Sequence, residues 1–131
     1  MTFRQAYISE VCRRLQNVGL PVSRVVMDGA DIDDDDVIKV HRGKDILLSE
    51  STGWRNRELQ LCISVATSKV LAEDVAENFF VQFDPVVKAS DDFPDVVSVE
   101  ESSADEPIYG GANGRACLVT FRYSVTYQVK G

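Results

Sequence analysis

A run of six carboxylates within nine residues, ending at Asp36, provides the first candidate chemistry. Asp31, Asp33 and Asp35 match the first, third and fifth ligand positions of a helix–loop–helix calcium site. The match ends there, because the sixth position is Asp36 where Gly is needed and the twelfth is Arg42 where Glu is needed. We expect Asp31, Asp33 and Asp35 to attract a divalent cation weakly, against the alternative of a solvated acidic loop without metal.

The sequence offers no nucleophilic or phosphate-binding site. His41 is the single histidine, and no Gly-x-Ser-x-Gly motif presents a serine. The glycines at 110, 111 and 114 precede Arg115 and a strand pattern, which favours a hairpin connection over a phosphate loop. Cys12, Cys62 and Cys117 are too dispersed for a zinc or redox unit and favour a reduced, cytoplasmic protein; Cys12 and Cys117 are expected in the core. We therefore expect neither enzymatic activity nor a cofactor.

One basic and aromatic cluster, Trp54 with Arg55 and Arg57, stands just before a predicted strand. It could contact nucleic acid, but pairing with an acidic patch on a neighbouring subunit fits the overall charge better. We expect the following residues to form such a subunit interface, with solvated side chains as the alternative: Arg55, Arg57, Asp91, Asp92 and Asp95.

The overall charge restricts the possible partners. Fourteen Lys and Arg residues against twenty-one Asp and Glu residues give a formal net charge of -7. Residues 84–106 alone carry eight carboxylates and a single base, Lys88. Such a surface is unsuited to gripping nucleic-acid phosphates or anionic lipid. There is also no signal-peptide core and no apolar run of membrane-spanning length, so no membrane contact is expected.

Hydrophobic periodicity indicates the elements that hold these residues. A helix is predicted over residues 3–18, and a second one after Ser68, with Ser68 as its N-cap. Asp84-Pro85 is expected to disrupt or end the second helix. Alternation or apolar runs predict strands in the following segments: 22–27, 37–41, 58–65, 96–99 and 117–129. Residues 109–114 are expected to connect the last two strands.

This order predicts one α+β domain over residues 1–131. We expect two amphipathic helices packed on one face of a mostly antiparallel or mixed sheet of about four to five strands. The opposite face of the last strand, with Thr120, Arg122 and Ser124, is polar and is expected to be available for contacts.

The whole pattern resembles the tail-terminator proteins of long-tailed bacteriophages, the minor tail protein U type. The likeness covers nearly the full chain: an N-terminal helix, an acidic irregular segment, the alternating strand 58–65, a second helix after Ser68, a long acidic stretch and the closing strand Phe121-Arg122-Tyr123-Ser124-Val125-Thr126-Tyr127-Gln128-Val129.

The resemblance implies a non-catalytic virion component, made in the host cytoplasm and placed in the tail. Six copies would form a ring that caps the tail tube, ends its polymerisation and provides the head-joining surface. The implied partners are the chain itself, the tail tube protein and a head-completion protein, while DNA passes through without specific binding. Magnesium would serve as an aid to assembly, since acidic loops repel one another across a ring.

Three alternatives remain open at this point. One is another ring-forming neck or head-completion protein. The second is a small divalent-metal-binding module or metal-dependent enzyme built on the aspartate run. The third is an adaptor that binds a peptide along an exposed strand edge and stays monomeric without it.

Overall fold

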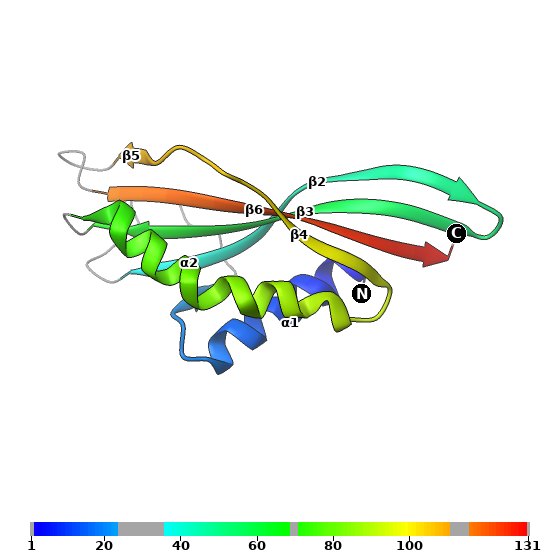
Figure 1. The fold of residues 1–131 in the computed structure, drawn as a ribbon, viewed down its shortest axis with the longest axis horizontal. Coiled ribbons are helices and arrows are strands. Elements are labelled where there is room, and N and C mark those ends of the chain that lie inside the picture. Colours follow the sequence, from blue (N-terminus) through cyan, green and yellow to red (C-terminus); the bar gives the residue numbers. More distant parts are fainter. Residues whose placement is uncertain (1, 24–35, 69–70, 111–115, 131) are drawn as a thin grey trace.

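A mixed six-stranded sheet forms the centre of the fold, and two α-helices lie along one of its faces (Figure 1). The computed structural model describes residues 2–23, 36–68, 71–110 and 116–130. In chain order the elements are α1 (Phe3–Asn17), β1 (Val22–Ser23), β2 (Val37–Ser51), β3 (Trp54–Thr67), α2 (Ala72–Lys88), the 3₁₀ helix η2 (Ala89–Asp92), β4 (Val96–Ala104), β5 (Ile108–Gly110) and β6 (Ala116–Lys130). Neither α-helix is long and apolar enough to span a membrane.

Helix α1 begins at a capping box. The Gln5 backbone N–H donates to the Thr2 hydroxyl at 3.3 Å, and the Thr2 backbone N–H donates to the Gln5 side chain at 2.9 Å. After the helix, Gly19 adopts a φ of 87°, which a residue with a side chain rarely takes. The predicted helix is confirmed, and its apolar stripe is buried at Tyr7, Ile8, Val11, Cys12 and Leu15.

Strands β2 and β3 form a long hairpin that extends past the helices (Figure 1). Both are longer than their alternation predicted, since β2 continues beyond His41 and β3 begins before Glu58. Gly53 lies at the turn with a φ of 80°, a conformation suited to glycine. The predicted buried face of β3 is confirmed, because Leu59, Leu61, Ile63 and Val65 are all fully buried.

Helix α2 differs from its prediction at both ends. It begins after Leu71, and no side chain caps it, so the predicted N-cap at Ser68 is wrong. It also runs through Pro85 to Lys88, although Asp84-Pro85 was expected to disrupt or end it. Phe83 and Val87 are both fully buried on either side of the proline. Their packing holds the chain helical across a residue that cannot donate a backbone hydrogen bond.

Strand β6 joins the two parts of the sheet. It pairs along β3 on one side and with β4 and then β5 on the other, all antiparallel. β1 pairs with β2 in parallel, so the strand order is β1-β2-β3-β6-β4 with β5 beside β6. The α+β class and the helix-covered face are therefore confirmed, with six strands in place of four to five. The additional strand is β5, in a segment predicted to be only a connection.

Aromatic side chains fasten the helices to the sheet. Phe80 of α2 stacks on Phe121 of β6 with ring centroids 4.8 Å apart, and Phe3 of α1 stacks on Tyr127 at 3.9 Å. Tyr7 is fully buried, and its hydroxyl bonds the Ser90 hydroxyl at 2.7 Å. These contacts leave the far half of the β2–β3 hairpin without a helix beneath it (Figure 1).

Candidate functional site

Two edges of the sheet lack a partner strand within the part of the chain that the structure describes. β1 pairs with β2 only at Ile38 and Lys39. Val40 is fully buried, and among the described residues the exposed part of the outer side of β2 begins at Arg42. On the opposite side of the sheet, β4 pairs with β6 alone. An open edge presents unpaired backbone N–H and C=O groups and can accept another strand.

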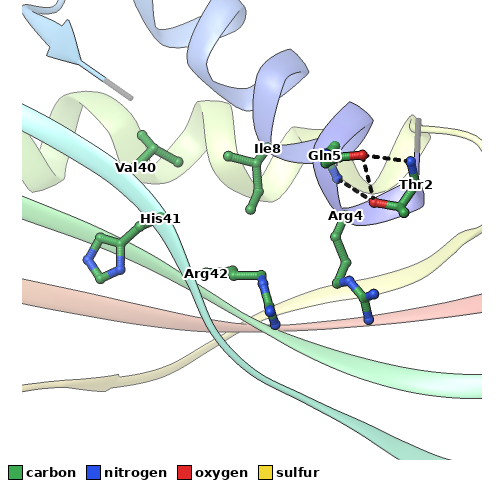
Figure 2. Close-up of a pocket in the computed structure, with 7 residues that line it drawn as sticks. All are labelled: Thr2, Arg4, Gln5, Ile8, Val40, His41 and Arg42. Carbon is green, nitrogen blue, oxygen red and sulfur yellow. Dashed lines mark hydrogen bonds between the residues drawn. The ribbon is translucent and has the colours of Figure 1, made fainter. Parts of the chain in front are cut away.

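A pocket of about 390 Å³ lies beside the open edge of β2 (Figure 2). Its helical wall is the start of α1, held in place by the Thr2–Gln5 capping box, and its floor is the edge itself at Val40, His41 and Arg42. The Arg4 and Arg42 side chains extend in the same direction in Figure 2. The pocket therefore brings the positive charges of Arg4 and Arg42 to the β2 edge.

The two open edges differ in charge. The β2 edge carries Arg42 and Lys44, both exposed, beside Arg4 of α1. The β4 edge carries Glu100 and Glu101, also exposed, and the Lys88 ammonium lies 4.0 Å from Glu101. The edges are thus complementary in charge.

A buried carboxylate, Asp45, anchors the hairpin to the rest of the protein. Its side chain is 2% exposed, and its Oδ1 pairs with Arg57 Nε at 2.7 Å. Its Oδ2 pairs with Arg4 Nη1 at 3.3 Å and also accepts a hydrogen bond from the Tyr127 hydroxyl. Burial raises the pKa of Asp45, but the hydrogen bonds from Tyr127, Arg57 and Arg4 outweigh it and hold the pKa below its usual value. The group is therefore ionised and joins α1, β2, β3 and β6.

The face of the sheet opposite the helices holds a polar network. Arg122 Nη2 pairs with Asp105 at 2.7 Å, and Arg122 Nη1 donates to Gln60 at 3.1 Å and to the Cys62 sulfur at 3.0 Å. The Arg122 guanidinium lowers the pKa of Asp105, and burial raises the pKa of the Cys62 thiol. Cys62 is therefore a protonated, unreactive thiol at neutral pH.

The same face brings His41 to Ser64, a pairing that sequence spacing did not reveal. His41 Nε2 lies 3.2 Å from the Ser64 hydroxyl, which also bonds the Thr120 hydroxyl at 2.8 Å. Burial lowers the pKa of His41, so the ring is neutral at pH 7. Ser64 is only 2% exposed, which keeps a substrate away from its oxygen. The face predicted to be available is thus closed at Ser64 and at Thr120, which is 8% exposed.

The polar network also explains why position 43 is a glycine. A β-bulge between Arg42 and Asp45 places Gly43 beside Gln60, and a Cβ at Gly43 would collide with the Gln60 side-chain oxygen. Arg122 in turn holds Gln60 in that position. The shape of the β2 edge therefore depends on the polar face behind it.

The predicted interface residues occupy two regions. Arg57 is engaged by Asp45, and Asp92 pairs with Arg14 at 2.8 Å. Arg55 lies near the hairpin tip, 3.5 Å from Glu50, and both side chains are more than half exposed. Asp91 and Asp95 are exposed at the other edge, before β4. Within one subunit the structure does not bring the arginines and these aspartates together.

The predicted metal ligands Asp31, Asp33 and Asp35 lie outside the described residues. Among the residues that are described, no group of three His, Cys, Asp or Glu side chains could hold a metal ion. Asp36, the last aspartate of the run, accepts a hydrogen bond from the Thr67 hydroxyl at 2.6 Å.

Apolar side chains at the hairpin form a surface that the sequence reading missed. Near the tip of the hairpin, Ile46, Leu47, Leu48 and Trp54 are between 45% and 48% exposed. The run 46–48 interrupts the alternation expected of a half-buried strand, and that interruption is the signal that could have found the surface.

Comparison with known proteins finds a similar solved structure. No family model matches the chain, and no curated protein matches it. A chain in the solved structure described as "Virion of native gene transfer agent (GTA) particle" aligns with a TM-score of 0.61 and 15% sequence identity. The alignment covers 95% of this chain and 94% of that chain. The two chains therefore share a fold over nearly their whole lengths.

Proposed function

We propose that this chain is a structural subunit of a phage-like particle, and that it acts as a tail terminator. Six copies form a ring that caps the tail tube, stops its polymerisation and presents the surface to which the filled head is joined. The observation that carries the proposal is the fold shared from end to end with a chain of a gene transfer agent virion. The resemblance of the element order to tail-terminator proteins supports the narrower role.

The surface chemistry supports a structural role. The His41–Ser64 contact is closed to substrates because Ser64 is 2% exposed, and the Cys62 thiol has a raised pKa. Exposed carboxylates such as Glu77 and Glu106, together with a formal net charge of -7, give the subunit a surface that repels DNA phosphates. A genome could pass through such a ring without adhering to it.

The first experiment measures the absolute mass in solution. Light scattering after size exclusion, across protein concentration and with magnesium present or chelated, is expected to show a discrete hexamer that magnesium promotes. The ring would then be added to growing tail tubes, whose lengths are measured by electron microscopy. Capping predicts shorter tubes with the ring at one end, whereas tubes of unchanged length would contradict the terminator role.

The aspartate run is the proposed origin of the magnesium effect. Replacing Asp31, Asp33 and Asp35 with Asn while sparing Asp36, which bonds Thr67, should abolish the dependence on magnesium. The matched control carries three neutral replacements on exposed positions of α2, at Glu73, Asp74 and Glu77, and should keep the dependence. A dependence that survives in the first variant would contradict this assignment.

Another ring-forming neck or head-completion protein is the alternative within the same class. The matched structure is described as a whole virion, and its description names no component. Binding to head-completion assemblies but not to tube ends would favour this alternative. Tight binding of one metal ion by a permanent monomer would instead favour a metal module.

A further inference from the structure

We infer that neighbouring copies in the ring join by strand pairing, with the open edge of β2 in one copy bound to the outer edge of β4 in the next. The inference rests on the proposed ring and names the surface that builds it. Its partner is a second copy of this chain, bound through backbone hydrogen bonds and a pair of complementary charge clusters.

The strand directions allow this pairing without inverting a subunit. β2, β3, β6 and β4 are neighbours in that order, and each pair among them is antiparallel. β4 therefore runs opposite to β2 within one copy. When a second copy is placed beside the first in the same orientation, its β2 meets β4 antiparallel, and the helix-covered faces stay on one side of the joined sheet.

The two edges also lie at the same height along the sheet. In the register of the sheet, Val40 of β2 pairs with Ile63, Ile63 pairs with Phe121, and Phe121 pairs with Ala104 of β4. At the other end, Leu47 is joined through Arg57 and Tyr127 to Val96. The stretches 40–47 and 96–104 are thus level, and copies joined in this register have no stagger along the strands. A head-to-tail contact without such a rise closes into a ring when the rotation between neighbouring copies divides a full turn, whereas a contact with a rise extends as a helix.

The charged residues on the two edges lie level with one another across the sheet, in rows of residues that pair from strand to strand. Arg42 is joined through Leu61 and Tyr123 to Glu101, so in the level register Arg42 faces Glu101 of the next copy. Gln60 lies opposite the bulge that contains Lys44 and is joined through Ser124 to Glu100. Two cross-strand ion pairs therefore form at one register, and opposite charges at such positions stabilise a sheet.

The same register brings together predicted interface residues that the single subunit keeps apart. The Asp95 carbonyl accepts a hydrogen bond from the Gln128 N–H at 2.9 Å, and Gln128 is joined through Asn56 to Ser49 of β2. Asp95 of one copy is therefore level with the next copy's hairpin tip, where Arg55 lies one strand in from the edge. The bulges in β2 and β4 make both edges irregular, which disfavours pairing in other registers.

Charge reversal tests the pairing. One variant carries Arg42→Glu and Lys44→Glu, a second carries Glu100→Lys and Glu101→Lys, and a third carries all four. Each of the first two should weaken self-association at least about tenfold, because like charges then face each other, and the third should restore it to within about threefold. The matched control for the second variant, Glu73→Lys with Glu77→Lys on α2, makes the same charge change away from both edges and should assemble normally.

Cross-linking tests the register. When a mild oxidant such as oxidised glutathione is added, Arg42→Cys combined with Glu101→Cys should form disulfides between copies and give a ladder of masses that ends at the closed ring. Ser98 lies in the row of Ile46, so Arg42→Cys combined with Ser98→Cys should not cross-link. The native cysteines are buried and free. Each variant's urea midpoint is compared with wild type, because Lys88 lies 4.0 Å from Glu101.

The outcomes separate this inference from the proposed function. A ring that forms despite charge reversal and without the Arg42–Glu101 cross-link would overturn the edge pairing and leave the ring intact. A cross-link ladder that grows without end, into filaments, would support the edge pairing and overturn the closed ring. A chain that stays monomeric and uncross-linked at every concentration would overturn both.

Discussion

Removing the buried charge at Asp45 should weaken the protein more than removing any exposed ion pair. Asp45→Asn keeps the shape of the side chain but leaves Arg4 and Arg57 without a counter-charge. Leaving a fully buried charge without its partner costs about 3 to 5 kcal/mol of unfolding free energy. The Arg4 and Arg57 side chains, however, are 35% and 24% exposed and can reach water. With one acceptor oxygen kept for the Tyr127 hydroxyl, we expect a loss of about 2 kcal/mol in the free energy of unfolding.

The effect of this substitution should depend on pH in a defined direction. The folded-state pKa of Asp45 lies below its usual value, so the carboxylate stabilises the fold fully above the unfolded pKa, near about 4. That contribution is lost as the pH falls through the folded pKa. The difference between wild type and Asp45→Asn should therefore be constant from pH 7 to about pH 5 and should shrink below about pH 4.

Urea unfolding, followed by circular dichroism at pH 7 and pH 3, measures both quantities. The matched control is Asp105→Asn, which breaks the Arg122 ion pair; its two side chains are 27% and 36% exposed. This control should cost less than about 1 kcal/mol. The reasoning would be refuted by an Asp45 variant no less stable than the Asp105 variant, or by a difference that persists unchanged at pH 3.

Three further substitutions test other parts of the structure. Gly43→Ala should displace Gln60 and cost about 1 to 3 kcal/mol of unfolding free energy, whereas Gly110→Ala, where a Cβ meets no atom within 4 Å, should cost clearly less. Pro85→Ala should stabilise the protein by about 1 kcal/mol by restoring a backbone hydrogen bond in α2, and a higher urea midpoint would show it. Tyr7→Phe should cost about 1 to 2 kcal/mol, because the Tyr7 hydroxyl bonds the Ser90 hydroxyl in the core. Burial raises the pKa of Tyr7 to about 12, so the wild type should lose stability as the pH rises from 10 through 12, and the Phe variant should lose less.

Periodicity in the sequence predicted the elements whose faces are buried. The alternation of Leu59, Leu61, Ile63 and Val65 predicted their burial correctly. Alternate residues of a strand lie on one face, and an apolar face is buried away from water. The same reasoning failed for β2 beyond His41, where Gly43, Lys44 and Asp45 show no alternation. That half of the strand is fixed by the bulge and by the Asp45 ion pairs, which depend on residues far away in the sequence.

Helix ends and side-chain clusters were beyond the reach of local rules. A proline near the end of a helix pattern usually marks its limit, but buried Phe83 and Val87 carry α2 past Pro85. The Asp45 cluster draws on four elements, and the His41–Ser64–Thr120 chain on three strands. Spacing in one sequence cannot reveal such groups, because the sheet order that joins them is set by packing of the whole chain.

The place of β6 in the sheet has a consequence for how the protein folds during synthesis. β6 follows every other described element along the chain, yet it pairs with β3, β4 and β5. Trp54 must find Lys130 across the intervening chain, and contacts so distant in sequence form slowly. Until β6 leaves the ribosome, β3 keeps a long unpaired side and β4 has no strand to join, so the growing chain is exposed to aggregation. A nascent subunit therefore lacks its β4 edge until nearly all of the described chain has been made, so under the inferred edge pairing incomplete chains would not join finished ones through that edge.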